Sequence, residues 1–200
     1  MDRAVLDVGF LTVTAAFKLG EFPNLDCEVL QMPYNGQHQD MYIFLPNKVG
    51  GLQELETKLF NAETCHEWYP LLGKMPVKLV KVAIPAFHLE MYKSMKSTLC
   101  RMGLQSIFSP EAGALKAWTK TGDCCITDYY QHIKIVTSFQ GKYSVPSKKN
   151  IRRMSIINNM GKPANFRANH PFLFMVHDRA TDAVQFLGRI CYPNQKHVKQ

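Results

Sequence analysis

Short runs of β-branched and aromatic residues, most of them ended by turn-forming residues, restrict the fold of this chain more than any other feature of its sequence. Residues 27–34 and 40–46 are two such runs, and Asn35-Gly36 between them is the strongest short signal for a β-hairpin. We therefore predict an antiparallel pair of strands here. Residues 77–89 are predicted to form two strands, or one strand bent at Pro85. Another strand is predicted over 125–139. Residues 171–177 and 184–190 are predicted to form a buried terminal hairpin.

Helical spacing of apolar residues marks a few shorter segments. Leu52, Leu55 and Leu59 lie at helical intervals, which predicts an amphipathic helix with its leucines in the core. A second helix, anchored by Trp68, is expected to end by Pro70, because a proline inside a helix removes a backbone hydrogen bond.

A third helix is predicted between Met91 and Gly103. Met91, Met95, Leu99 and Met102 lie at helical spacing, and Gly103 stands where a glycine commonly ends a helix. We expect this stripe to pack in the core rather than to bind a ligand.

Basic residues are concentrated in one region. The chain has a net charge of +8, and between Tyr129 and His177 it contains lysine and arginine but neither aspartate nor glutamate. Residues 140–165 are predicted to form one exposed loop, and loops longer than about 12–15 residues are usually functional or disordered. This loop is either a solvated basic segment or a site that attracts polyanions or presents its basic residues to a protease. The basic residues of the region are Lys134, Lys142, Lys148, Lys149, Arg152, Arg153, Lys162 and Arg167.

The same sequence disfavours several functions. No apolar run approaches the roughly 20 residues of a membrane helix, and residues 1–10 make a poor signal peptide because they contain two aspartates and no cleavage site. Nucleic-acid binding is disfavoured, since few aromatics interleave the basic stretch. We expect neither a cofactor nor a metal, because no CxxC pair and no histidine cluster at zinc spacing occurs. The six cysteines are Cys27, Cys65, Cys100, Cys124, Cys125 and Cys191, and the adjacent pair is expected to remain unpaired thiols.

Several sequence motifs resemble those of the serpin family of protease inhibitors. Phe166–Phe174 (FRANHPFLF), followed by Phe186–Pro193 (FLGRICYP), is similar to the C-terminal signature of that family. The resemblance covers residues 17–194, which leaves 1–16 unmatched and 195–200 as a tail. Weaker motifs at 30–34 (LQMPY), 41–46 (MYIFLP), 84–87 (IPAF) and 102–109 (MGLQSIFS) follow the order of the family.

The resemblance implies an α+β fold: the C-terminal portion of a serpin, with antiparallel strands of sheets B and C, part of sheet A, and three or four short helices. It also implies a reactive-centre loop over about 141–165, offered as a substrate to a serine protease, for which a trypsin-like enzyme is one candidate. After cleavage such a loop inserts as a strand into sheet A and distorts the attached protease. The resemblance further implies a secreted protein that is not an enzyme, although a cytoplasmic location is not excluded, because this chain carries no signal peptide.

The predicted hinge of the loop departs from the family pattern. Inserting serpins have small residues there, whereas this chain has Lys142 and Pro146. A desolvated ammonium group costs several kcal/mol, and a proline withholds a backbone donor from a central strand. The alternative is a non-inhibitory serpin or a truncated, non-functional fragment. The hinge residues are Gly141, Lys142, Tyr143, Ser144, Val145 and Pro146.

Other site residues are predicted by position in the family pattern. The scissile bond involves Arg153, Met154 or Ser155. The candidate bonds are Arg152-Arg153, Arg153-Met154, Met154-Ser155 and Ser155-Ile156, and all four stay open. His132 matches a histidine beneath the opening of sheet A, and we favour a hydrogen-bonded core residue over a switch. The predicted contacts for a heparin-like polyanion are Lys148, Lys149, Arg152 and Arg153.

Overall fold

The computed structural model of the chain describes residues 8–34, 38–61, 63, 65–119, 124–137 and 161–193. The chain forms two compact units. The first unit contains the described residues up to Ala86 and from Thr137 onwards, and the second contains those from Phe87 to Val136. Strands from both ends of the sequence therefore share the first unit.

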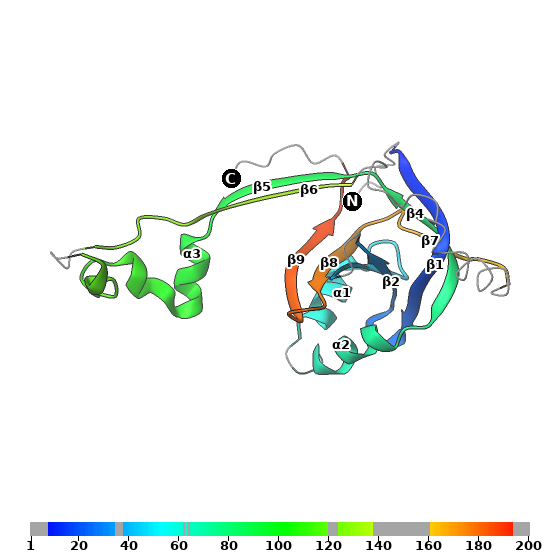
Figure 1. The fold of residues 1–200 in the computed structure, drawn as a ribbon, viewed down its shortest axis with the longest axis horizontal. Coiled ribbons are helices and arrows are strands. Elements are labelled where there is room, and N and C mark those ends of the chain that lie inside the picture. Colours follow the sequence, from blue (N-terminus) through cyan, green and yellow to red (C-terminus); the bar gives the residue numbers. More distant parts are fainter. Residues whose placement is uncertain are drawn as a thin grey trace. The chain divides into compact units, whose positions relative to one another are not determined.

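A seven-stranded sheet forms the first unit (Figure 1). Its strand order is β7-β4-β1-β2-β3-β8-β9; β4 and β7 run parallel, and all other neighbours are antiparallel. Antiparallel neighbours joined by short turns agree with the predicted hairpins. The strands are β1 (Phe10–Phe22), β2 (Cys27–Pro33), β3 (Gln39–Pro46), β4 (Val77–Pro85), β7 (Ala164–Arg167), β8 (Phe172–Asp178) and β9 (Ala183–Ile190).

The long strand β1 belongs to both halves of this sheet. Its segment Phe10–Lys18 pairs with β4, and its segment Lys18–Phe22 pairs with β2. Figure 1 shows the sheet curving round, so that its two ends face each other across an interior. Residues that pair across neighbouring strands are fully buried in both halves of the sheet, so both halves contribute to the core of the unit. They include Val80, Val82, Phe166, Leu30, Ile43 and Phe174.

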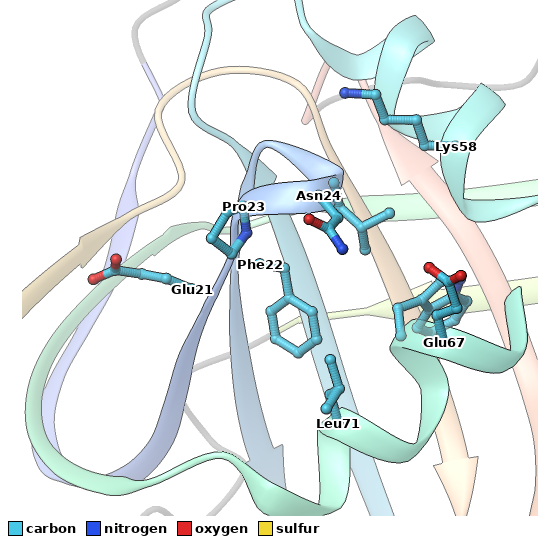
Figure 2. A pocket seen from close by; sticks show the side chains of 9 residues that line it. Glu21, Phe22, Pro23, Asn24, Lys58, Glu67 and Leu71 are labelled. Atoms are coloured by element: carbon cyan, nitrogen blue, oxygen red, sulfur yellow. The ribbon is translucent and has the colours of Figure 1, made fainter. Parts of the chain in front are cut away.

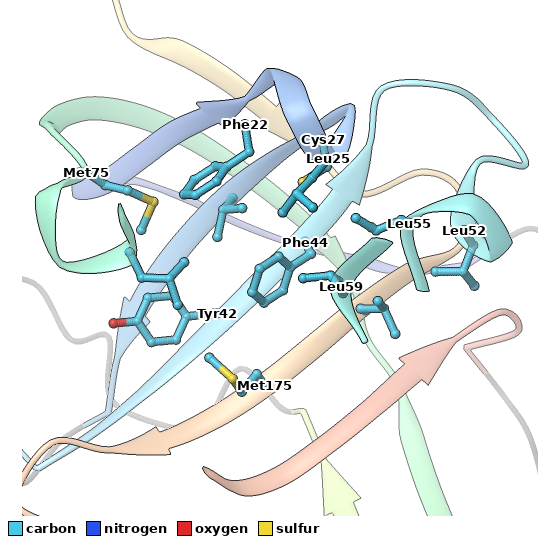
Figure 3. Packing of buried hydrophobic residues seen from close by; sticks show 13 residues of the cluster. Phe22, Leu25, Cys27, Tyr42, Phe44, Leu52, Leu55, Leu59, Met75 and Met175 are labelled. Atoms are coloured by element: carbon cyan, nitrogen blue, oxygen red, sulfur yellow. The ribbon is translucent and has the colours of Figure 1, made fainter. Parts of the chain in front are cut away.

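Helices α1 (Leu52–Leu59) and α2 (Cys65–Lys74) contribute to a second core (Figure 3). The leucines of α1 are buried as predicted, and each fully buried leucine stabilises the fold by roughly 1.5–3 kcal/mol. On the sheet they meet apolar residues from four strands and the turn after β1, including Phe22, Leu25, Cys27, Val29, Tyr42, Phe44, Leu173 and Met175.

The prediction that the second helix ends by Pro70 is wrong, because α2 continues to Lys74 with Pro70 inside it. A proline inside a helix costs about 3 kcal/mol. The packing on both sides of the proline offsets this cost. Leu72 is buried, and the Trp68 ring packs edge-on against Phe44 with 5.7 Å between ring centroids.

The second unit contains a two-stranded antiparallel sheet and a set of short helices. The sheet pairs β5 (His88–Ser94) with β6 (Tyr130–Val136). The predicted break at Pro85 is therefore real, since β4 and β5 are consecutive strands in different sheets. Between β5 and β6 lie α3 (Lys96–Leu99), a π-helical turn (Cys100–Leu104) and the 3-10 turns Gln105–Phe108 and Lys116–Trp118; a further 3-10 turn, Pro23–Leu25, belongs to the first unit.

The third predicted helix is only partly correct. Met91 lies in β5 opposite Ile133, and α3 begins only at Lys96, because strand pairing overrides the helical spacing. Met102 is 73% exposed, so the proposed core stripe is wrong for this residue. Gly103 has φ 94°, the left-handed conformation predicted for a glycine at a helix end.

Two predicted strand boundaries also change. The strand predicted over 125–139 is shorter, because β6 covers only Tyr130–Val136. The terminal hairpin β8–β9 is confirmed, but only β8 is buried, since β9 is an edge strand exposed along most of its length. The paired strands β2 and β3 are confirmed, while Asn35-Gly36 lies outside the described residues.

Two predicted limits fall inside strands: the start of the segment that resembles the serpin family and the end of the loop. Residue 16 lies in the middle of β1, so the predicted boundary there is not the end of an element. The loop prediction ended at residue 165, but Ala164 and Asn165 already belong to β7. None of the described helices has both the length and the apolar character needed to cross a membrane.

Candidate functional site

Most residues of the predicted reactive-centre loop lie outside the described part of the chain. The described flanks are β6, which ends at Val136, and β7, which begins at Ala164. The loop segment therefore connects a strand of the two-stranded sheet to a strand of the seven-stranded sheet. The predictions that fall outside the described residues concern Gly141, Lys142, Tyr143, Ser144, Val145, Pro146, Lys148, Lys149, Arg152, Arg153, Met154 and Ser155.

Strand β6 leads into the loop, and one of its edges has no partner strand among the described residues. It pairs with β5 in a register that runs from Ser94–Tyr130 to His88–Val136. Within the described residues no strand pairs with its other edge. An edge strand offers N–H and C=O groups in the spacing that another strand requires. The edge of β6 can therefore accept one more strand.

His132 lies on β6 and is hydrogen bonded, but it is not a core residue. Its Nε2 atom lies 3.0 Å from Glu90 Oε1, and its side chain is 54% exposed. His88 Nε2 lies 3.4 Å from the other oxygen of Glu90, so one carboxylate contacts two imidazoles. The predicted hydrogen bonding agrees with this geometry, but the predicted core position does not, because the two-stranded sheet leaves this face of His132 open.

Three basic residues of the acid-free region are described. Lys134 lies opposite Glu90 in the β5–β6 ladder, and Lys162 is exposed. The Arg167 guanidinium lies 4.7 Å from the ring centroid of Phe10, a cation–π contact within the first unit. Arg167 is therefore engaged with an aromatic ring of β1.

A buried polar cluster lies in the first unit, and it was not predicted from the sequence. Asp40 is fully buried at the start of β3. Its Oδ2 atom accepts a hydrogen bond of 2.7 Å from Gln31 Nε2 and lies 3.0 Å from Arg179 Nε. A buried carboxylate requires such partners, since an unpaired buried charge is strongly destabilising. The signal in the sequence was an aspartate that directly precedes the apolar run of β3.

The cluster extends to α2 and to the turn between β8 and β9. His177 lies opposite Asp40 in the β3–β8 ladder, and its Nε2 atom is 2.8 Å from the Tyr69 hydroxyl and 2.9 Å from Asp182 Oδ1. Burial raises the pKa of Tyr69, so its hydroxyl keeps the proton that it donates to Asp182. Asp182 has φ 55°, a left-handed conformation that aspartate tolerates.

A cavity of about 190 Å³ opens beside α2 (Figure 2). Its lining combines an apolar wall, formed by Phe22, Pro23, Leu25, Trp68 and Leu71, with polar residues at the rim. Such a combination is typical of sites for small organic molecules. The rim residues are Glu21, Asn24, Lys58 and Glu67.

Five of the six cysteines are free thiols: Cys27, Cys100, Cys124, Cys125 and Cys191. Cys27 is buried, and burial raises the pKa of its thiol to about 12. Cys100, Cys124, Cys125 and Cys191 are half-buried and unpaired, in agreement with the prediction for the adjacent pair. In the part of the chain that the structure describes, no three His, Cys, Asp or Glu residues are grouped so that they could hold a metal ion.

Comparison with known proteins identifies the family. A family model described as "Serpin (serine protease inhibitor)" matches residues 2–193. This match covers nearly the whole chain, so the chain belongs to the serpin family, as its C-terminal motifs predicted.

Curated relatives at moderate identity include two inhibitors of the same name. The chain is 30% identical to the leukocyte elastase inhibitor of Xenopus tropicalis over 175 residues, which is 86% of this chain and 44% of the relative. It is 29% identical to the human leukocyte elastase inhibitor over 185 residues, which is 88% of this chain and 46% of the relative. Human serpin B5 is 25% identical over 192 residues, 93% of this chain and 48% of the relative. The chain spans somewhat less than half the length of these relatives.

Solved structures confirm the predicted α+β serpin fold. Uncleaved ovalbumin superimposes with a TM-score of 0.75 at 24% identity, over 96% of this chain and 46% of that one. A tumour-suppressing serpin gives a TM-score of 0.75 at 25% identity, over 93% of this chain and 48% of that one. The seven-stranded sheet, the two-stranded sheet and the short helices are thus the C-terminal portion of a serpin.

Proposed function

We propose that this chain contributes the reactive-centre loop of a serine protease inhibitor. The observation that carries the proposal is the open edge of β6, because the loop segment starts immediately after this strand. A segment that folds back from Val136 can lie antiparallel to β6 and form a ladder along the edge that no described strand occupies. Membership of a family described as serine protease inhibitors supports the same function.

In the proposed reaction the protease acts on the loop, and this chain supplies no catalytic residue. The protease serine attacks a peptide bond next to Arg153, Met154 or Ser155, and the newly formed ester holds the loop to the enzyme. Insertion of the cleaved loop beside β6 then moves the attached protease. Arg152 and Arg153 favour a trypsin-like enzyme, whose specificity pocket carries a carboxylate.

The hinge supports a second candidate, a non-inhibitory serpin. For Lys142 to enter a sheet interior, its ammonium group must lose water, which costs several kcal/mol unless it finds a partner. Pro146 cannot donate to a ladder with β6. Both residues slow insertion, and slow insertion lets the protease complete hydrolysis. The loop is then an ordinary protease substrate.

Incubation with trypsin separates the two candidates. Inhibition gives a covalent complex that survives SDS electrophoresis, whereas a substrate gives only two cleaved fragments. The double variant Lys142→Thr, Pro146→Ala is expected to raise the yield of complex, because it removes both obstacles to insertion. Lys162→Ala is the matched control and should leave the yield unchanged. Complete cleavage without complex in both the parent and the hinge variant would overturn the inhibitory proposal.

Binding of a heparin-like polyanion by Lys148, Lys149, Arg152 and Arg153 stays a prediction, as does a secreted location. Exposed cations attract polyanions in a salt-dependent manner. Retention on heparin at low salt should therefore disappear when all four residues are replaced by alanine. Retention that persists in this variant would assign polyanion binding to another surface.

A further inference from the structure

The cavity beside α2 has a wall that is formed by well-anchored side chains. Phe22 and Leu25 are buried in the core behind it. The Trp68 indole donates a hydrogen bond of 3.3 Å to the carbonyl of Leu59, and its ring packs edge-on against Phe44 at 5.7 Å. These contacts fix the orientation of the indole, so the apolar wall exists before any ligand arrives.

The rim of the cavity carries carboxylates that are not neutralised. The ammonium group of Lys58 lies 2.9 Å from Glu54, so its positive charge already has an acidic partner. Among the described residues neither Glu21 nor Glu67 forms an ion pair. In Figure 2 the side chains of Phe22, Leu71, Asn24 and Glu67 surround one space, whereas the Glu21 carboxylate points away from Phe22. Among the charged lining residues, Glu67 is therefore the one that faces this space and forms no ion pair within the described residues.

We infer that this cavity binds a small organic cation with an apolar body and one ammonium group. The ammonium group pairs with the Glu67 carboxylate. The apolar body packs against Phe22 and Leu71, and the face of Trp68 attracts the positive charge. A volume of about 190 Å³ suits a single ring with a short side chain. A carboxylate in place of the ammonium group is repelled by Glu67.

The probe is phenethylamine, and the signal is the fluorescence of Trp68 in the full chain. The sequence has only one other tryptophan, Trp118, which is replaced by phenylalanine to remove its contribution. We expect a saturable change in fluorescence on titration with phenethylamine. We also expect binding to weaken about tenfold or more in Glu67→Gln, since a charge-assisted hydrogen bond is lost.

Two controls make the assignment specific. Glu111→Gln removes an exposed carboxylate of the second unit and should leave binding unchanged. Phenylacetate has the same ring but the opposite charge and should not bind. Equal binding of phenylacetate, unchanged binding in Glu67→Gln with unaltered circular dichroism, or a fluorescence change that never saturates would each overturn the inference. None of these outcomes depends on protease inhibition.

Discussion

Removal of Arg179 tests the buried carboxylate of Asp40 most directly. Asp40 is fully buried, and Arg179 is the charged partner at 3.0 Å. Loss of one partner from a buried pair costs about 3–5 kcal/mol. The Arg179 side chain is 46% exposed, and Gln31 still donates to the carboxylate in its absence. Water screens part of the pair, so we expect Arg179→Ala to lower the free energy of unfolding by about 2–3 kcal/mol.

A double-mutant cycle separates two contributions to the loss of stability: an unpaired buried charge on Asp40 and the lost packing of Arg179. Asp40→Asn keeps the shape of the side chain but removes its charge. On this background Arg179→Ala leaves no buried charge without a partner, and it should cost only about 0.5–1 kcal/mol. The difference between the two costs measures the electrostatic coupling of the pair.

Urea unfolding of the full chain, followed by Trp68 fluorescence in the Trp118→Phe background, measures these free energies. Arg189→Ala is the control, because its guanidinium contacts Glu56 at 3.2 Å but its side chain is 58% exposed. We expect this control to cost less than about 1 kcal/mol. If Arg179→Ala costs no more than Arg189→Ala, or costs the same with Asn at position 40, the argument from burial is refuted.

Three further predictions concern other parts of the first unit. Burial raises the pKa of Glu28 above 4.5, so its ionised form destabilises the fold. Glu28→Gln should therefore have a higher urea midpoint than the parent at neutral pH. This difference should vanish below pH 4.5, where Glu28 is protonated. The Cys27 thiol, with its pKa near 12, should resist maleimide in the native protein while the half-buried Cys191 reacts, as peptide mass mapping would show. A Cβ atom at Gly188 would lie 2.7 Å from the Phe174 ring, so Gly188→Ala should cost about 1–3 kcal/mol, and a cost that Phe174→Leu does not relieve would contradict this explanation.

Local sequence patterns predicted the elements that are encoded by residues close together in the sequence. The leucines of α1 are spaced for one buried face, and α1 forms where this spacing begins. The runs that become β2, β3 and β8 alternate or continue in apolar residues between turn signals, and all three are strands. The motif that begins at Phe166 predicted the serpin family from adjacent residues alone, and the family is confirmed.

Contacts between distant segments decided what local patterns could not. Met91 has helical spacing with its neighbours, but it pairs across a ladder with Ile133 on β6. Pro70 is a helix breaker by its chemistry, yet the burial of Leu72 keeps it inside α2. In both cases the free energy of tertiary packing exceeds the local preference, which amounts to at most about 0.7 kcal/mol for an ordinary residue and about 3 kcal/mol for proline.

The candidate sites also differ in whether the sequence alone reveals them. An acid-free, polar stretch is visible in the sequence alone, because its composition does not depend on a partner, and it marked the loop region. The cluster around Asp40 and the cavity beside Glu67 arise only when separate segments meet. The sequence by itself determined the family and most strands, since neighbours along the chain encode alternation and turns. The tertiary structure decided which polar groups became buried, because burial depends on residues far away in the sequence.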